Sequence, residues 1–537
     1  MKKMSFASLM VLSFALVFVF TAQPVMAQVD TAWVRTYNGS DNGDDVAAAI
    51  AVDGAGNVYI TGSRYVAGSS QDYLTIKYLP NGDIAWVRTY NGPGSNTDFA
   101  VSIALDIGGN VCVTGTSIGA YGAPDLATIK YSSTGNQLWV ARSPSSLPEF
   151  ACDIAVDAGG SIYAGGTFFS PPSTYGYLVI KYDPFGNQYW LTSYSHGSMC
   201  QARGIAVNGS SDVYIGGWMV TPMTGTPDFF TVKFNASGTY QWSQYFNGYY
   251  PYGPDTAYVF CMDPSGNVWT GGRGYLGPQR LGDYCVVGYD PSGNLLGPYA
   301  YNGPGNGEDC VTDLAFDGSG NYFCTGRSVG SGSGQDYATL GSIFPVQRYN
   351  GPANGDDCAL SIAMDDSGSV YVTGYSSGVG TGQDYLTVKY FSNGNTTWTA
   401  RYNGLGNGDD RAVDIAVDDS GNVYVTGWCI GSGSGKDVVT IKYSQGPSTC
   451  SYTPGDVNGS DSYNGLDITF GVSYLKGIGS DPICPLGSCP IPPCDAFFYC
   501  GDVNGSCSYN GLDITYGVNY FKGGQGPIYC PDCPPAG

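Results

Sequence analysis

The residues with the clearest potential for chemistry form two copies of one loop near the C-terminal end of the chain. Oxygen-bearing side chains stand at loop positions 1, 3, 5, 9 and 12, which is the spacing by which an EF-hand loop surrounds calcium. The predicted ligands are Asp456, Asn458, Ser460, Ser462, Asn464 and Asp467 in the first loop, and Asp502, Asn504, Ser506, Ser508, Asn510 and Asp513 in the second. We therefore predict two calcium sites, to which Ser462 and Ser508 contribute their backbone carbonyl groups at position 7.

Each loop offers only two carboxylates, so the predicted calcium affinity is weak, about 0.1–1 mM as in other extracellular modules. Asp461 and Cys507 occupy position 6, where a glycine usually permits the sharp turn. Each loop continues into a short helix candidate, over residues 466–476 and 512–522. A pair of purely structural Asn-Gly turns is the alternative interpretation of this duplication.

Upstream of these loops, eight copies of one segment of about 52 residues fill residues 32–443, which indicates one supersecondary unit used many times. The marker Asp-x-x-Gly-Asn, strict or degenerate, begins at Asp53, Asp106, Asp157, Asn208, Asp263, Asp317, Asp365 and Asp418. Each copy holds four short runs rich in Val, Ile, Tyr and Thr, separated by turn-forming residues. Four strands per copy fit a β-propeller blade. A β-solenoid is the alternative architecture.

The two ends of the repeat region predict a closed ring. The first copy begins with its fourth strand, Ala32–Asn38, and the last copy stops after its third strand, at Tyr443. The N-terminal strand can therefore complete the last blade and leave no sheet edge half finished. The predicted inner strands start near Val46, Phe99, Phe150, Gly204, Thr256, Cys310, Cys358 and Ala412.

These patterns predict an all-β fold: an eight-bladed β-propeller of four-stranded blades closed by the N-terminal strand, followed by a small α-helical domain that carries the calcium loops. Residues 1–27 have the basic start, short apolar run and small-residue end of a signal peptide. The predicted domains are therefore a signal peptide at 1–27, the propeller at 28–443, a linker at 444–452 and a Cys-rich calcium-binding domain at 453–537.

Composition narrows the partners and the compartment. The formal net charge of −22 argues against nucleic acid as a partner, because phosphates require a basic surface. We expect no membrane span once the signal is removed, and a secreted or cell-surface location. Seventeen cysteines in an exported chain predict disulfides, among them a bond between Cys310 and Cys358, which share a repeat position. In the tail, zinc is the less favoured role for the thiols.

Non-repeated aromatic residues are the best candidates for ligand contact, because an aromatic that recurs in every blade is expected to be core. They are Tyr65, Tyr121, Phe168, Phe169, Trp218, Tyr249, Tyr250, Tyr252 and Trp428.

Four acids that precede inner strands could ring one mouth of the propeller and bind a cation, with turn capping as the alternative; they are Asp45, Asp309, Asp357 and Asp410. We predict no catalytic residue, since the single histidine, His196, has no serine elbow beside it.

Two resemblances follow from these motifs. The run Asp418–Gly427 and the run Asp384–Tyr390 resemble the SBBP family of bacterial β-propeller repeats, which implies a propeller and an exported protein. The family name implies seven blades, whereas this chain has eight copies. The duplicated loop and helix resemble the dockerin module of type I, with Asp456, Asn458 and Asp467 at calcium positions. That resemblance implies calcium-dependent attachment to a cohesin-like or cell-surface protein and a setting of polysaccharide breakdown.

The sequence thus favours a secreted, non-catalytic binding or scaffold protein, whose propeller presents a surface to a ligand or partner, possible ligands including a glycan, while its tail attaches it elsewhere. Two other functions stay open. One is a carbohydrate-active enzyme, a glycoside hydrolase or lyase on a propeller scaffold, and the other is a structural component of a surface layer.

The calcium assignment predicts that EGTA lowers the melting temperature of residues 444–537, because removing the ion leaves the carboxylates of each loop to repel one another. Thermal melting with and without EGTA measures this. An unchanged melt would remove the calcium assignment.

Overall fold

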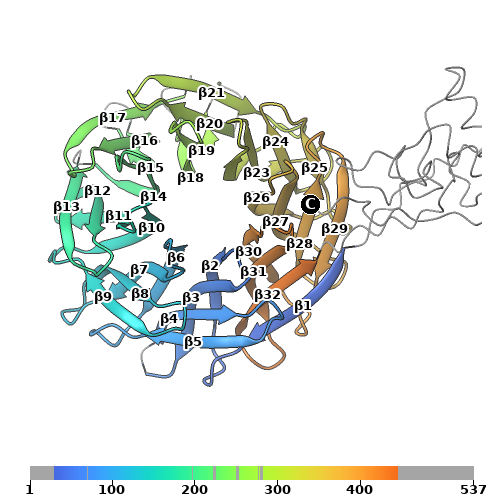
Figure 1. The fold of residues 1–537 in the computed structure, drawn as a ribbon. Coiled ribbons are helices and arrows are strands. Elements are labelled where there is room, and N and C mark those ends of the chain that lie inside the picture. Colours follow the sequence, from blue (N-terminus) through green and yellow to red (C-terminus); the bar gives the residue numbers. More distant parts are fainter. Residues whose placement is uncertain are drawn as a thin grey trace, which may run out of the picture. The chain divides into compact units, whose positions relative to one another are not determined.

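Eight antiparallel sheets of four strands each surround a common axis (Figure 1). This computed structural model describes residues 29–444, apart from residues 69, 196–197, 222–224, 249–252, 276 and 278–281. The predicted eight-bladed propeller of four-stranded blades is therefore confirmed. The predicted signal peptide, calcium loops and helices lie outside the described residues, as does the predicted linker except for Ser444, which is the last residue of the final strand.

The strands of each blade follow one another along the chain from the axis outward, except in blade 8. Blade 1 comprises β2 (Val46–Val52), β3 (Val58–Val66), β4 (Ser70–Tyr78) and β5 (Ile84–Tyr90), and blade 2 comprises β6 (Asp98–Leu105), β7 (Val111–Ile118), β8 (Pro124–Tyr131) and β9 (Gln137–Arg142). Blade 3 comprises β10 (Glu149–Val156), β11 (Ile162–Ser170), β12 (Thr174–Tyr182) and β13 (Gln188–Ser195), and blade 4 comprises β14 (Cys200–Val207), β15 (Val213–Val220), β16 (Pro227–Phe234) and β17 (Tyr240–Phe246). Blade 5 comprises β18 (Thr256–Met262), β19 (Val268–Gly274), β20 (Asp283–Tyr289) and β21 (Leu295–Tyr301), and blade 6 comprises β22 (Cys310–Phe316), β23 (Tyr322–Val329), β24 (Gln335–Gly341) and β25 (Gln347–Tyr349). Blade 7 comprises β26 (Cys358–Met364), β27 (Val370–Ser377), β28 (Gln383–Tyr390) and β29 (Thr396–Tyr402), and blade 8 comprises β30 (Asp410–Val417), β31 (Val423–Ile430), β32 (Lys436–Ser444) and β1 (Asp30–Tyr37).

Blade 8 closes the ring in the predicted way. The N-terminal strand β1 pairs antiparallel with β32, with Val34 opposite Ile441 and Trp33 opposite Lys442. The outer strand of this blade therefore comes from one end of the propeller sequence and its three other strands from the opposite end.

The predicted inner-strand starts agree with the structure within two residues in seven blades. In blade 4 the strand begins at Cys200, whereas the prediction placed its start at Gly204. Each inner strand carries a bulge after its second or third residue, and in β14 the bulge lies between Ala202 and Gly204. The polar residues before this bulge hid the start of β14 from a hydrophobicity pattern.

Repeated tyrosines form the core, as expected. All twelve of the largest fully buried side chains among the described residues are tyrosines, among them Tyr59, Tyr73 and Tyr78. Their rings fill the spaces between neighbouring blades, where they meet strand residues such as Ile76 and Val113. The abundance of tyrosine in this chain therefore mainly reflects packing between blades.

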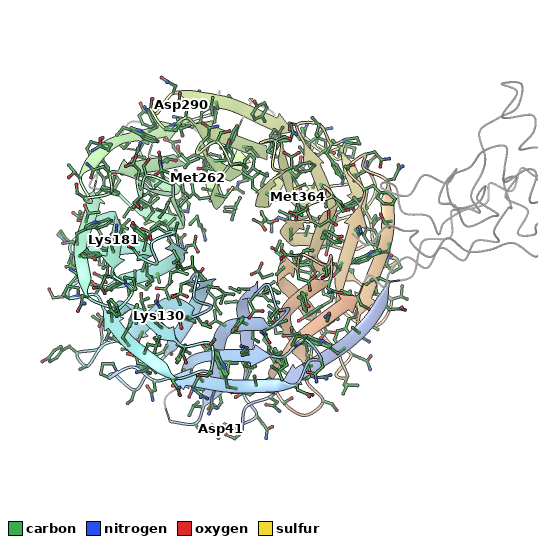
Figure 2. All side chains as sticks on the ribbon, viewed as in Figure 1. Asp41, Lys130, Lys181, Met262, Asp290 and Met364 are labelled. Carbon is green, nitrogen blue, oxygen red and sulfur yellow. The ribbon has the colours of Figure 1, made fainter. Side chains whose placement is uncertain are left out.

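In blades 1, 2, 4 and 8 a tryptophan and a lysine join the blade to the next one by donating to the same carbonyl oxygen. In blade 1, Trp86 Nε1 and Lys77 Nζ lie 3.2 and 3.1 Å from the carbonyl oxygen of Ser133 in blade 2. At the closure the same contact is made by Trp33 and Lys442, which lie 3.1 and 3.5 Å from the Pro80 oxygen in blade 1. Figure 2 labels Lys130, which donates to the Pro184 oxygen, and Lys181 of the next blade, which lies 4.8 Å from the Tyr163 ring centroid.

Blades 5 and 6 lack both donors of this contact, because Gly288 and Gly341 replace the lysine and the tryptophan is absent as well. Larger side chains fill the space. A Cβ atom added at Gly288 would lie 2.6 Å from Trp269. In blade 6, Phe344 is 3% exposed and packs on Phe323 at 5.7 Å between ring centroids. Blades 5 and 6 therefore depart from the repeat sequence because their cores are packed by different side chains.

The closure contact predicts that Trp33→Ala destabilises the whole propeller. Trp33 is 7% exposed, and emptying such a site costs about 3–5 kcal/mol of the free energy of unfolding. Chemical denaturation measures this, with Ile84→Ala as the control, since Ile84 is 48% exposed on β5 and its removal should change stability by less than about 0.5 kcal/mol. Equal effects of the two substitutions would contradict the assignment.

Candidate functional site

The four acids expected to ring one mouth do not form a cation site, and the turn-capping alternative is the correct one. Asp45, Asp309, Asp357 and Asp410 are completely buried. The carboxylate of Asp309, for example, accepts hydrogen bonds from the backbone N–H groups of Gly303 and Val329, at 2.6 and 2.9 Å. The acids thus fasten the loop that enters each inner strand to the end of the second strand, and their oxygens are not directed at solvent.

The aromatic candidates divide into several environments. Phe168 is only 9% exposed and packs in the core of blade 3, so its predicted contact role is wrong. Tyr121 is fully exposed and Tyr65 is 37% exposed. Phe169 is half-buried against Tyr175, with ring centroids 4.6 Å apart. Three further candidates, Tyr249, Tyr250 and Tyr252, lie outside the described residues, as does His196. The last two, Trp218 and Trp428, are described below.

The predicted disulfide between Cys310 and Cys358 is absent. All nine cysteines of the described blades are free thiols, and most are buried. Cys310 and Cys358 instead donate to the carbonyl oxygens of Val311 and Ala359, at 3.2 and 3.3 Å. Burial raises the pKa of Cys358 to about 11, so this thiol is protonated at neutral pH and is a poor nucleophile.

One position of the second strand breaks the repeat symmetry and marks the candidate site. The residue that directly follows the recurring second-strand glycine, which pairs with the inner strand at its bulge, is a buried Ser or Thr in blades 1–3, whereas it is large in blades 4–8. The five large residues are Trp218, Arg273, Arg327, Tyr375 and Trp428. We call these residues, with their neighbours Arg203, Tyr258, Glu308, Arg411 and Lys436, the arc. It extends over five blades at the end of the propeller where the inner strands begin.

An ion-pair cluster occupies the arc between blades 5 and 6. The carboxylate of Glu308, in the loop that leads to β22, lies 2.6 Å from Arg273 Nη1 and 3.3 Å from Arg327 Nη2. All three side chains keep contact with solvent, with exposed fractions of 18%, 35% and 29% for Arg273, Glu308 and Arg327. The Nε atoms of both arginines are buried without a hydrogen-bond partner among the described residues. The cluster therefore has one carboxylate for two guanidinium groups.

A second cation is held between two rings at the junction of blades 7 and 8. The guanidinium carbon of Arg411 lies 4.5 Å from the Tyr375 ring centroid and 5.7 Å from that of Trp428. Arg411 Nε donates to Gln383 Oε1 at 2.8 Å. Lys436 Nζ lies 4.0 Å from the Trp428 centroid. Cation–π contacts and one hydrogen bond thus fix the plane of Arg411.

Arg203 and Tyr258 extend the arc into blades 4 and 5. Arg203 Nε donates to the carbonyl oxygen of Ala257 at 3.1 Å, and its guanidinium lies 5.6 Å from the Tyr258 ring centroid. The electrostatic field of Arg273 and Arg327 reaches Tyr258, although burial is the main reason that the pKa of Tyr258 is raised. Arg203 and Tyr258 therefore connect blade 4 to the ion-pair cluster between blades 5 and 6.

Deeper along the inner strands, two carboxyl groups share a serine. Ser361 Oγ lies 2.9 Å from both Asp313 Oδ2 and Asp414 Oδ1, and Asp414 Oδ2 accepts from the Ile50 N–H across the ring closure. A hydroxyl has one proton, so both contacts are hydrogen bonds only when one carboxyl is protonated. Burial, with the charge of Asp313 as a further cause, raises the pKa of Asp414 to about 7. Burial raises the pKa of Asp313 to about 6.

This acid pair resembles the paired carboxyl groups of glycosidases, which lie roughly 5–9.5 Å apart. Its oxygens, however, are already engaged: Asp313 also accepts from the N–H groups of Leu314 and Ile362, and Asp414 from those of Ile50 and Ile415. These bonds tie blades 6, 7, 8 and 1 together along their inner edges. The pair is accordingly built as a clamp between blades.

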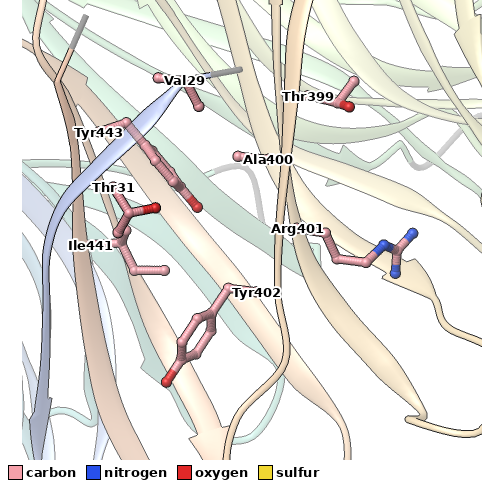
Figure 3. Close-up of a pocket in the computed structure, with 8 residues that line it drawn as sticks. All are labelled: Val29, Thr31, Thr399, Ala400, Arg401, Tyr402, Ile441 and Tyr443. Atoms are coloured by element: carbon pink, nitrogen blue, oxygen red, sulfur yellow. The ribbon is translucent and has the colours of Figure 1, made fainter. Parts of the chain in front are cut away.

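A cavity of about 220 Å³ lies at the seam between blades 7 and 8 (Figure 3). Its lining includes Val29, Thr31 and Tyr443 from blade 8 and Tyr402 from β29. No turn joins β32 to β1, because these strands come from opposite ends of the propeller sequence. Trp398 Nε1, whose equivalents donate to that turn in the next blade, accordingly has no partner among the described residues. The cavity is a consequence of the closure.

Sequence reasoning named Trp218 and Trp428 but missed the charged members of the arc. The signal was available in the repeat register. When the second strands of all blades are aligned, Ser63, Thr116 and Thr167 occupy the same repeat position as Arg273, Arg327 and Tyr375. The change from a small hydroxyl residue to a large side chain is visible in that alignment. The contacts of Glu308 and Arg411 could not be found that way, since they join different blades.

Comparisons with known proteins agree with the propeller. Residues 397–432 match the model of the SBBP family, described as a β-propeller repeat. An uncharacterized WD repeat-containing protein of Acanthamoeba polyphaga mimivirus is 25% identical over 238 residues, covering 33% of this chain and 17% of the relative. The chain thus matches well under two thirds of that protein's length.

Three solved structures are similar to this chain at low identity and low TM-score. A puromycin hydrolase variant has 11% identity and a TM-score of 0.41, over 72% of this chain and 59% of the hydrolase. The α-L-arabinanase of Penicillium chrysogenum, solved with arabinobiose, has 10% identity and a TM-score of 0.38, over 63% and 91%. The propeller domain of the trilobed protease from Pyrococcus furiosus has 9% identity and a TM-score of 0.38, over 64% and 93%. Likeness at this level says nothing about the ligand.

Two other features are absent from the described part of the chain. No group of three or more His, Cys, Asp or Glu side chains in the described blades is arranged to hold a metal ion. No helix among those residues is long and apolar enough to cross a bilayer.

The acid clamp predicts a pH-dependent stability. Because the pKa of Asp414 is raised in the folded protein to about 7, its stabilising contribution is complete at low pH and is lost as pH rises through about 7. Asp414→Asn removes that titration and can keep the hydrogen bonds to Ile50 and Ser361. We expect the variant to lose on the order of 2 kcal/mol less stability than wild type between pH 5 and 8. Denaturant titrations at several pH values measure this, with Asp419→Asn, at an exposed position, as control; parallel curves for wild type and Asp414→Asn would contradict the clamp.

Proposed function

We propose that this chain is a secreted, non-catalytic binding protein whose propeller recognises its ligand through the arc. The single observation that carries the proposal is the break in repeat symmetry at the second-strand position. Blades 1–3 place a buried hydroxyl residue there, whereas blades 4–8 place a cation or a large aromatic residue. A blade folds without such a side chain, so its presence in five consecutive blades calls for a role other than packing.

The state of the arc side chains supports a role in recognition. Arg273 and Arg327 keep exposed surface, and a single carboxylate, that of Glu308, pairs with both guanidinium groups. Arg, Trp and Tyr are also the residues that dominate the binding energy of protein interfaces.

The chemistry around the axis favours binding over turnover. The acid pair of Asp313 and Asp414 is engaged by backbone N–H groups of four blades, and the Cys358 thiol is protonated at neutral pH. A carbohydrate-active enzyme is the alternative, and the observation that favours it is that two carboxyl groups contact the same Ser361 hydroxyl.

The proposal extends to the remainder of the chain. Residues 1–27 direct export, and residues 453–537 bind two calcium ions through Asp456, Asp467, Asp502 and Asp513 with their loop neighbours. By resemblance to dockerin, this tail attaches the propeller to a cohesin-like or cell-surface protein, in a setting of polysaccharide breakdown.

The proposal predicts that the full chain binds glycans on an array without releasing products, and that Arg273→Gln combined with Arg327→Gln weakens binding at least tenfold. Each lost charge-assisted hydrogen bond is worth about 1.5–3 kcal/mol. The control is Arg88→Gln on β5, which removes a half-buried arginine from outside the arc. Release of new reducing ends from a bound glycan would establish the enzyme instead, and unchanged binding by the double variant would remove the arc from recognition.

A further inference from the structure

Resting on the proposed function, we infer that the arc binds an acidic polysaccharide that carries carboxylates along its chain, a polyuronate, and that Arg411 anchors one of these carboxylates. A polyuronate is a narrower class than the ligand proposed above, because both its charge and its chemistry are specified.

The arc has the opposite charge to the chain that carries it. It contains five cationic side chains and the single carboxylate of Glu308, in a protein of net charge −22. Three exposed acids, Asp44, Asp356 and Asp409, lie on the loops around it and accept from the N–H groups of Lys436, Gln335 and Gln383. These acids reduce the field at a distance, so an anion is held by direct contact with the guanidinium groups and gains little from long-range attraction.

Arg411 offers a preorganised fork for a carboxylate. Its Nε is fixed by Gln383 and its plane by the Tyr375 and Trp428 rings. Neither of its terminal nitrogens has a protein partner among the described residues, and these two nitrogens form the edge that binds carboxylates in a bidentate way. The fork loses little conformational entropy on binding, because its neighbours already hold it.

Glu308 shows that the arc accommodates a carboxylate in a second place. Its carboxylate lies between Arg273 and Arg327, at 2.6 and 3.3 Å. Both arginines keep exposed surface, and together they carry two positive charges against the one negative charge of Glu308. Anion-binding groups thus recur along the arc, between blades 5 and 6 and again between blades 7 and 8, which suits a ligand with charges at intervals along a chain.

Two features favour a polysaccharide over an acidic peptide. A peptide often binds a sheet by adding a strand to an open edge. Here the inner strands of blades 1, 4 and 7 each have an N–H group that is already engaged, because Asp414, Asp153 and Asp313 of the preceding blades accept from Ile50, Ile205 and Ile362. The rings of Tyr258 and Tyr375 beside the guanidinium groups also suit the apolar faces of sugar rings.

Isothermal titration calorimetry of the full mature chain with a galacturonic acid octamer tests the inference, with the fully methyl-esterified octamer as a matched neutral ligand. EGTA is present so that calcium cannot bridge the glycan and the tail. We expect the ester to bind at least tenfold more weakly than the acid. Arg411→Gln should weaken binding of the acid at least tenfold, Arg411→Lys should weaken it less, and Arg88→Gln should leave it unchanged.

Several outcomes would overturn the inference. Equal affinity for acid and ester would mean recognition by stacking, and equal affinity for poly-glutamate or dextran sulfate would mean a site for any polyanion. Loss of binding in Arg88→Gln as well as Arg411→Gln would point to a general effect on the fold, which thermal melting of both variants checks. Binding of neutral glycans alone, still abolished by the Arg273 and Arg327 double variant, would overturn this inference and leave the proposed function intact; no glycan binding at all would remove both.

Discussion

The structure depends on the pairing of β1 with β32, which joins the two ends of the propeller sequence in one sheet. Through this pairing Trp33 and Lys442 donate to the Pro80 oxygen, in the way that a tryptophan and a lysine of blades 1, 2 and 4 donate to the blade that follows each of them. Without it blade 8 would expose a sheet edge and blade 1 would lose a neighbour. The closed ring in turn brings eight inner strands to one axis, which is the arrangement that lets residues of five blades form one arc (Figure 1).

Residues that repeat and residues that do not repeat have different tasks in this ring. The repeated tyrosines fill the core, and the repeated acids such as Asp309 fasten the loops that enter the inner strands. Non-repeated residues such as Arg411 and Glu308 make their contacts between blades at one end of the ring. The first set secures the fold, and we propose that the second set serves recognition.

The repeats were sufficient to predict the blade count, the four strands of each blade and the closure, because period and strand phase are properties of the sequence itself. The sequence did not decide whether Asp357 is a buried turn cap or an exposed cation ligand, since an aspartate in either role can directly precede a strand. It placed Phe168 among the contact residues because the residue is not repeated, whereas it packs in the core of its blade. The sequence identified only the two tryptophans of the arc and none of its charged residues. The partners of Arg411, for example, come from two blades and meet only in the folded ring.

Hydrogen exchange of the full chain, followed by mass spectrometry of peptides, tests the closure most directly. The account predicts that amides of residues 30–37 in β1 are protected to about the same degree as those of residues 84–90 in β5, because both strands are the outer members of complete blades. Exchange of residues 30–37 at the rate of an unstructured segment, with β5 protected, would contradict it.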